Sequence, residues 1–210
     1  AGALDKPAAA RVPRRNDAVR IVAGRHRGRR LQAPDGLAVR PTSERAREAL
    51  FDVLAGGRLT EGRNALSDAC VLDGFAGSGA LGLEALSRGA AHVVFMENHP
   101  AALAALEANV SSLGEEDRTT VLRADVLRPS PSASRPEARP CALVLLDPPY
   151  NQGLAGPALT ALGKAGWLAE GALGVVELMA GEPFDAPAGF AQVEARKYGK
   201  ALLVFLNWRR

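Results

Sequence analysis

The chain has 210 residues, 47% of them hydrophobic and 23% charged, which is an ordinary composition for one globular domain with a small appendage. No apolar run approaches the roughly 18 residues of a membrane-spanning helix and no apolar core follows the first arginines, as it would in a secretory signal, so we expect a cytoplasmic protein with no membrane partner. The net charge is +3, but residues 1–47 hold 12 Lys and Arg against 4 Asp and Glu, whereas the rest hold 14 against 19.

The basic N-terminal part of the chain favours docking of a polyanion over a merely solubilising tail. Residues 1–18 lack any periodicity and are predicted to be a disordered basic tail. Residues 19–32 are predicted to form a β-hairpin, with strands at 20–24 and 28–32 and a cationic turn, Arg25-His26-Arg27, between them.

A helix is predicted at residues 44–54, because its apolar positions form a stripe at helical spacing and a Gly-Gly pair follows. Arg45 and Arg47 fall off that stripe, so we expect both side chains to be free to face a ligand. Residues 19–57 therefore form an N-terminal extension of hairpin and helix, placed ahead of a main domain at 58–210.

Strands and helices alternate through the main domain. We expect strands at 71–72, 92–96, 119–122, 142–146 and 173–178, helices at 79–88, 100–110 and 154–165, and a closing antiparallel pair of strands at 192–195 and 202–206. Repeated strand–helix units imply an α/β fold, with a parallel sheet covered on both faces. The proline-rich segment 129–140 can be neither helix nor strand and is predicted to be a loop or a disordered insertion.

A glycine-rich loop lies between the first strand of this domain and the helix that follows. Gly77, Gly79 and Gly82 have the GxGxxG spacing, so a dinucleotide site must be considered. Asp73 ends the strand, where its carboxylate would suit a cationic cofactor and would be awkward beside a pyrophosphate. S-adenosylmethionine carries an ammonium and a sulfonium but no phosphate, so the loop favours S-adenosylmethionine as the cofactor.

Acidic residues also follow the next two strands. Glu97 can accept hydrogen bonds from both ribose hydroxyls, as it would in a NAD enzyme, and Asp125 can accept from the adenine amino group. The alternative is structural: Asp73 as a capping residue, Glu97 as a surface residue and Asp125 as a turn residue. The predicted cofactor-binding residues are Asp73, Phe75, Gly77, Ser78, Gly79, Glu97 and Asp125.

A second motif, Asp147-Pro148-Pro149-Tyr150, directly follows the apolar run at 143–146. Two consecutive prolines cannot continue a central strand, so they fix a rigid turn at its carboxyl end, where α/β folds bind ligands. The Asp147 carboxylate and the Pro148 carbonyl can orient an exocyclic amino group of a base, which is a poor nucleophile, while Tyr150 offers a ring for stacking. The motif predicts an amino-methyltransferase in which Asp147 also takes the released proton; a structural Asp-Pro-Pro turn is the alternative.

The two cysteines, Cys70 and Cys141, stand singly in apolar runs. Cysteines of this kind are usually small buried hydrophobic residues. Since the chain has no CxxC and no Cys/His cluster, we expect neither a disulfide nor a metal site.

The chain resembles the bacterial family of small-subunit ribosomal RNA guanine-N2 methyltransferases over roughly residues 19–208. The segments that carry the resemblance are Arg20-Ile21-Val22-Ala23-Gly24, Gly28-Arg29, Arg40-Pro41-Thr42, Arg45, Arg47-Glu48-Ala49-Leu50-Phe51, Phe75-Ala76-Gly77-Ser78-Gly79-Ala80-Leu81-Gly82-Leu83-Glu84-Ala85, Asp147-Pro148-Pro149-Tyr150 and Lys197-Tyr198-Gly199. The two central motifs occur in many amino-methyltransferases, and the N-terminal set narrows the match. After the last of these segments the family usually has an acidic residue and Thr, where this chain has Lys200 and Ala201.

The resemblance implies a Rossmann-like, seven-stranded, mostly parallel sheet and S-adenosylmethionine as methyl donor. It also implies methylation at N2 of one guanine in 16S rRNA, within an assembled or assembling 30S subunit. We expect the protein itself to be a monomer without a metal. The basic extension then binds RNA phosphates. The predicted RNA-binding residues are Arg25, Arg27, Arg29, Arg30, Arg40, Arg45 and Arg47.

Three other functions stay open at this point. One is an amino-methyltransferase acting on adenine N6 in DNA or RNA, although such enzymes often carry Asn in place of Asp147. Another is a NAD-dependent oxidoreductase, which the GxGxxG spacing and Glu97 alone support. The last is a non-catalytic RNA-binding module.

Overall fold

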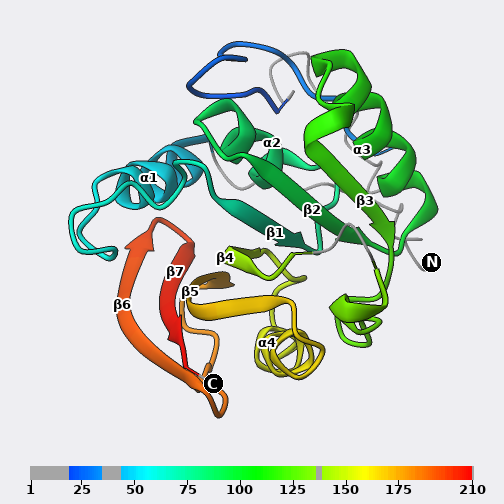
Figure 1. The fold of residues 1–210 in the computed structure, drawn as a ribbon. Coiled ribbons are helices and arrows are strands. Elements are labelled where there is room, and N and C mark those ends of the chain that lie inside the picture. The colour runs from blue at the N-terminus through cyan, green and yellow to red at the C-terminus, as the bar shows by residue number, and fades with distance from the viewer. Residues whose placement is uncertain (1–18, 35–43, 136–138, 210) are drawn as a thin grey trace, which may run out of the picture.

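The computed structural model describes residues 19–34, 44–135 and 139–209 of the chain. One seven-stranded sheet runs through them, with the strand order β3-β2-β1-β4-β5-β7-β6 (Figure 1). The strands are β1 (Cys70–Gly74), β2 (His92–Glu97), β3 (Thr119–Arg123), β4 (Cys141–Leu146), β5 (Leu168–Met179), β6 (Phe190–Tyr198) and β7 (Ala201–Trp208). Strands β1 to β5 are parallel and β7 is antiparallel to both its neighbours, so the prediction of a mostly parallel, seven-stranded α/β sheet is confirmed.

Helices cover both faces of the sheet. They are α1 (Glu44–Ala55), α2 (Ala80–Ser87), α3 (Pro100–Leu113) and α4 (Ala155–Lys164). Figure 1 shows α2 and α3 on one side of the sheet and α4 on the other. Buried apolar side chains join the strands to α1, α2 and α3 in one cluster and to α4 in a second. Val19, Ile21 and Leu31 belong to the first cluster, so the N-terminal extension shares its core with the main domain.

Strand β1 lies inside the sheet, between β2 and β4. The chain leaves β1 to build β2 and β3 on one side, and then returns to build β4 and β5 on the other. Sheets of this kind bind ligands at the carboxyl ends of the strands, where the reversal leaves a crevice between two loops. Here the two loops follow Gly74 of β1 and Leu146 of β4, which are register partners. The register therefore places both sequence motifs side by side at one edge of the sheet.

The N-terminal arm, residues 19–32, doubles back as predicted but forms no strands. Its two halves share a single antiparallel bridge, between Arg20 and Arg30, in place of the expected ladder. The reason is that the body of the protein binds backbone groups of the arm. The N–H groups of residues 22 and 23 donate to the Glu84 carboxylate on α2, over 2.7 and 3.0 Å. The arm is thus a docked segment and not a free-standing hairpin.

The proline-rich segment before β4 is more ordered than the sequence indicates. Its described part contains a single 3-10 turn, Ser132–Ser134. The prediction that this segment holds no helix is therefore wrong at these three residues. The buried Ser132 binds the turn between α4 and β5 twice, its N–H donating to the Ala165 carbonyl over 2.9 Å and its hydroxyl to the Gly166 carbonyl over 2.7 Å. The two bonds give donors to backbone carbonyls at the end of α4, and they hold the 3-10 turn against that end.

The predicted tail at 1–18 and the side chain of Arg40 lie outside the described residues. In the described ranges no helix is long and apolar enough to cross a membrane. Nor does the described part of the chain bring three His, Cys, Asp or Glu side chains together as a metal site would require.

Candidate active site

The loop between β1 and α2 is built around Asp73. This side chain is 1% exposed, and its Oδ2 accepts a hydrogen bond from the Gly82 N–H over 2.8 Å. Gly82 lies in the first turn of α2, whose N–H groups have no partner within the helix. Asp73 therefore caps α2 from the neighbouring strand, which is the structural role that the sequence left as an alternative. Its contact with a cofactor stays a prediction.

The glycines of the loop have different roles. A Cβ on Gly82 would lie 2.3 Å from Cε1 of Phe95, so this glycine allows α2 to pack closely on β2. Gly79 adopts a φ of +82°, which only glycine tolerates well. A Cβ on Gly77 would meet no atom closer than the Phe75 carbonyl oxygen at 4.0 Å, so open space lies beside this backbone. Gly77 is therefore the position at which the loop can cradle a ligand.

Phe75 and Ser78 hold this loop in shape. Phe75 has a φ of +60°, a left-handed conformation that is uncommon for a side chain of its size. The carbonyl of the buried Ser78 accepts a hydrogen bond from the Asn109 side chain of α3 over 2.9 Å. The backbone beside Gly77 is thus fixed by the fold.

Glu97 and Asp125 are bonded to nearby backbone. The half-buried Glu97 accepts from the N–H groups of Gly77, Asn98 and His99, each over 2.8 Å, so it joins the end of β2 to the glycine-rich loop. It is not the surface residue that the structural alternative supposed. Asp125 accepts from the Leu127 N–H over 2.9 Å, which is the geometry of the turn alternative. Contacts of both residues with a ribose or an adenine remain predictions.

Three carboxylates converge where β1, β2 and β4 end. Burial raises the pKa of the Asp73 carboxyl well above its ordinary value, the Gly82 N–H opposes this shift, and the negative charges of Asp147 and Glu97 add to it. The two sequence motifs are therefore close enough for their charges to interact. A site with this charge suits a cationic ligand and opposes a phosphate.

The second motif forms the turn after β4. Asp147 is half-buried, Pro148 buried and Pro149 exposed. The Tyr150 hydroxyl donates to Oε1 of Glu177 over 2.7 Å, and Glu177 is 3% exposed near the end of β5. This bond fixes the position of the Tyr150 ring beside the motif.

Glu177 is a site residue that lies outside both sequence motifs. Its signal was the lone acidic residue near the end of an otherwise apolar strand, Leu173-Gly174-Val175-Val176-Glu177-Leu178. Because β5 pairs with β4 in parallel, with Val176 level with Leu146, Glu177 follows at the level of Asp147. A buried carboxylate at the carboxyl end of a central strand is a functional-site signal of the same kind as Asp73.

Arg47 contradicts the expectation that it faces a ligand. Its side chain is 1% exposed, lies 3.9 Å from the Glu84 carboxylate and donates to the Arg20 carbonyl over 2.5 Å. Burial lowers the pKa of its guanidinium, and the charges of Glu84, Glu44 and Glu177 oppose that shift. The prediction that Arg47 binds RNA is wrong because the residue lies inside the protein, between α1, α2 and the arm.

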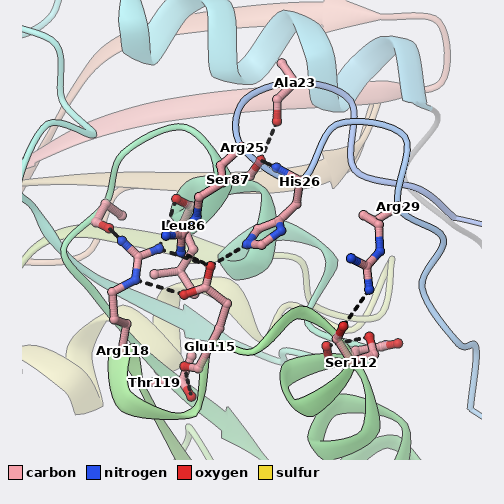
Figure 2. A network of polar contacts seen from close by, with 12 residues as sticks. Ala23, Arg25, His26, Arg29, Leu86, Ser87, Ser112, Glu115, Arg118 and Thr119 are labelled. Carbon is pink, nitrogen blue, oxygen red and sulfur yellow. Dashed lines mark hydrogen bonds and ion pairs between the residues drawn. The ribbon is translucent and has the colours of Figure 1, made fainter.

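The cationic turn of the arm is partly bound by the protein itself. Figure 2 shows Glu115, just after α3, as the centre of a network that includes Arg25, His26 and Arg118. The Arg118 Nε donates to Glu115 over 2.8 Å, and the Arg25 and His26 side chains contact the same carboxylate. Ser87 at the end of α2 adds two bonds to the backbone of residues 25 and 26, of 2.8 and 2.9 Å.

This docking places the turn at the C-terminal end of α2, whereas the cofactor loop lies at its N-terminal end. Of the remaining predicted RNA-binding residues, Arg25, Arg27, Arg29, Arg30 and Arg45 are exposed, and Arg25 is held by Glu115. Arg29 also donates to the Ser112 carbonyl over 2.5 Å. The described residues of the arm and α1 thus present exposed arginines, of which Arg20 and Arg25 are paired with Glu44 and Glu115.

The two cysteines are not isolated from each other. Cys70 begins β1 and Cys141 begins β4, and their sulfur atoms lie 2.9 Å apart as free thiols. The interpretation of two separate apolar residues is wrong, because parallel pairing brings positions 71 residues apart to the same end of the sheet.

The match to a known protein family covers nearly the same residues as the fold described above. The model of the family described as conserved hypothetical protein 95 matches residues 19–207. The chain is 39% identical to ribosomal RNA small subunit methyltransferase D of Escherichia coli over 76% of this chain and 74% of that protein, and 33% identical to the protein of that name from Haemophilus influenzae over 90% and 93%. The chain belongs to this family. A solved structure from Escherichia coli superposes with a TM-score of 0.73 at 35% identity, over 91% of this chain and 98% of that chain.

This member of the small-subunit rRNA methyltransferase family departs from the family pattern after Gly199, and the fold tolerates both departures. Lys200 is exposed, and its carbonyl accepts from the Ala180 N–H over 2.8 Å. Ala201 pairs with Met179 across β5 and β7. Backbone atoms make these contacts, so the turn does not depend on the side chains at 200 and 201.

Proposed function

We propose that the protein transfers the methyl group of S-adenosylmethionine to the exocyclic N2 amino group of a guanine in 16S rRNA. The observation that carries the proposal is the meeting of Asp147 with Asp73 and Glu97 at the carboxyl edge of the sheet. A methyl donor and an amino acceptor need sites side by side, and the register of β1 with β4 gives that arrangement. The names of the relatives, which are small-subunit rRNA methyltransferases, support the choice of 16S rRNA.

The residues around the first motif fit S-adenosylmethionine. Open space lies beside the Gly77 backbone, Glu97 supplies negative charge there, and a bound cation would oppose the raised pKa of the buried Asp73 and favour its carboxylate. Such charge stabilises an ammonium and a sulfonium, and the half-buried Asp125 can accept from the adenine amino group. When bound, S-adenosylmethionine supplies an electrophilic methyl group. The same charges oppose a pyrophosphate, which argues against the NAD-dependent oxidoreductase.

The second motif orients the acceptor. The Asp147 carboxylate and the Pro148 carbonyl accept from the two N–H bonds of the amino group and hold its lone pair toward the methyl donor. Tyr150, fixed by Glu177, stacks on the base. Asp147 also receives the proton that the amino group releases, which is general-base catalysis. Most of the rate enhancement then comes from alignment of the two reactants.

The exposed arginines of the arm and α1 supply the RNA contacts. Arg27, Arg29, Arg30 and Arg45 lie on the surface, where guanidinium groups bind phosphates through two parallel hydrogen bonds. The arm and the catalytic loop lie toward opposite ends of α2, so the RNA contact extends at least along that helix. A base within a folded RNA must leave its stack to reach the site.

Mass mapping of 16S rRNA, incubated with labelled S-adenosylmethionine and the protein, tests the proposal. We expect one methylated guanine in naked 16S rRNA or in 30S particles. The Asp147→Ala variant should lose at least about a hundred-fold in rate because it lacks both an acceptor and the base. Replacing the exposed Glu107 of α3 with Gln is the matched control and should leave the rate unchanged.

Three results would count against the proposal. Label in DNA adenine would favour the adenine-N6 enzyme, and unchanged transfer by Asp147→Ala would remove the catalytic role of that residue. Binding of the RNA without any transfer by the wild type would favour a non-catalytic RNA-binding module.

A further inference from the structure

A cavity of about 560 Å³ lies between α1 and the turn that joins β6 to β7. Its volume is within the range of sites that hold small ligands. In Figure 1 the helix and the end of β6 lie next to each other, although they are about 150 residues apart in the sequence. The cavity is lined by Arg45, Ala46, Glu48, Ala49, Asp52, Lys197, Tyr198 and Gly199.

The lining combines segments that carry the family resemblance but include none of the residues assigned to the cofactor or to the methyl transfer. Arg45 and Glu48-Ala49 come from the N-terminal set, and Lys197-Tyr198-Gly199 closes the C-terminal end. The fold brings these separate segments together around one space. Family-specific residues that meet in a cavity, away from the reacting atoms, are suited to recognition of the substrate.

The charged groups of the cavity are available for a ligand. Among the described residues, the side chains of Arg45, Glu48 and Lys197 make no hydrogen bond or ion pair, and all three are exposed. Asp52, in contrast, is held by Arg88 over 3.2 Å. The cavity therefore presents two cations and one carboxylate beside the half-buried ring of Tyr198.

The cavity lies close to the catalytic loop but does not include it. The Lys200 carbonyl accepts from the Ala180 N–H, one residue beyond the end of β5. The last residue of β5, Met179, lies 3.6 Å from the side-chain nitrogen of Asn151, which directly follows the second motif. None of residues 147–150 lines the cavity. A chain that enters the catalytic site can therefore place a neighbouring unit in this space.

We propose that this cavity binds a second guanosine nucleotide of the substrate RNA, distinct from the guanine that is methylated. Unpaired RNA bases are recognised by stacking on aromatic rings and by hydrogen bonds to their edges. The Tyr198 ring provides the stacking surface, and Arg45 and Lys197 provide the phosphate contacts. The Glu48 carboxylate only accepts hydrogen bonds. Guanine, which presents N1–H and N2–H donors side by side, is the base that it can bind through both oxygens.

This inference rests on the proposed function, and a variant of Glu48 tests it. Glu48→Gln removes the charge and one acceptor from an exposed position, so the fold should be unaffected. We expect the KM for 16S rRNA to rise about ten-fold or more, which is the usual effect of losing a two-bond contact to a base. The kcat and the affinity for S-adenosylmethionine should stay within two-fold. Glu107→Gln is again the control.

A binding measurement separates the cavity from the catalytic site. Guanosine 5′-monophosphate is titrated into the full-length protein and its binding followed by ligand-observed NMR, with adenosine 5′-monophosphate for comparison. We expect the guanosine nucleotide to bind the wild type and Asp147→Asn, to lose binding in Glu48→Gln, and to bind better than the adenosine nucleotide. Equal binding of the guanosine nucleotide by Glu48→Gln and the wild type would overturn the inference.

The two readouts distinguish failure of this inference from failure of the proposed function. If the wild type methylates 16S rRNA and Glu48→Gln has an unchanged KM, the inference is wrong and the function stands. If the wild type transfers no methyl group but Glu48→Gln still loses the guanosine nucleotide, the cavity is supported and the proposed reaction is wrong.

Discussion

Replacing Glu115 with Gln should destabilise the protein, because this carboxylate holds the N-terminal arm to the body. The Glu115 side chain is 1% exposed and contacts Arg25, His26 and Arg118 (Figure 2). Burial alone would raise the pKa of its carboxyl, but hydrogen bonds from Arg118, His26 and Arg25 outweigh burial and lower the pKa from 4.5 to about 2. The folded state therefore favours the ionised carboxylate over the protonated acid.

The size of the effect follows from that difference in pKa. Each pKa unit corresponds to about 1.4 kcal/mol, so the ionised Glu115 contributes roughly 3 kcal/mol to the free energy of unfolding. This contribution is fully present above the unfolded-state pKa of 4.5 and is lost as the pH falls toward about 2. For a chain of this length, a loss of about 3 kcal/mol corresponds to a decrease in Tm of roughly 6 to 12 °C.

Urea denaturation at pH 7, 5, 4 and 3 measures the difference in free energy of unfolding between the wild type and Glu115→Gln. We expect this difference to be constant from pH 7 to 5 and to shrink at pH 4 and 3. Glu116→Gln removes the same charge from the neighbouring exposed position and should have little effect at any pH. A Glu115 effect that is independent of pH, or equal to that of Glu116, would refute the role of the ionised carboxylate.

Two further substitutions test the region around the catalytic loop. Glu177→Gln and Tyr150→Phe should each lower kcat about ten-fold, because each weakens the hydrogen bond that fixes the Tyr150 ring. The double variant should be no slower than either single variant. If the two losses multiply in the double variant, the two residues act separately. Arg47→Ala should lower the free energy of unfolding by roughly 1 to 3 kcal/mol, since it removes a buried side chain and one of two cations beside the Glu84 carboxylate, the other being Arg88 at 2.7 Å. It should leave the salt dependence of rRNA binding by the folded protein unchanged, and a smaller salt slope would show instead that Arg47 contacts phosphate.

The sequence predicts the central part of the fold well because local signals determine it. Apolar runs give the buried strands, and Asp73 and Asp147 each follow one of them directly. Both residues lie at the carboxyl edge because parallel strands share that edge, so their proximity follows from the α/β pattern alone. The acidic residue of β5, Glu177, belongs to the same pattern, but one charge within an apolar run is a weaker signal than a motif.

The docked arm could not be predicted, because its partners come from distant parts of the chain. Glu84 and Glu115 belong to α2 and to the turn after α3, where a charged residue is usually exposed. The arm packs against both carboxylates, and both are buried in the structure. Arg47 was wrongly placed for a related reason: it precedes Leu50 and Phe51 by three and four positions and so shares their buried face, although its charge excluded it from the apolar stripe.

The central position of β1 has a consequence for the growing polypeptide. Strands β1 to β3 and the glycine-rich loop are synthesised first, before any residue of β4 exists. Until β4 arrives, one edge of β1 has no neighbour, and an open strand edge can pair with other chains. At bacterial synthesis rates the 66 residues between Gly74 and Cys141 take roughly 3 to 13 seconds. The half that holds the cofactor residues is therefore exposed to aggregation for seconds before the acceptor half can cover it.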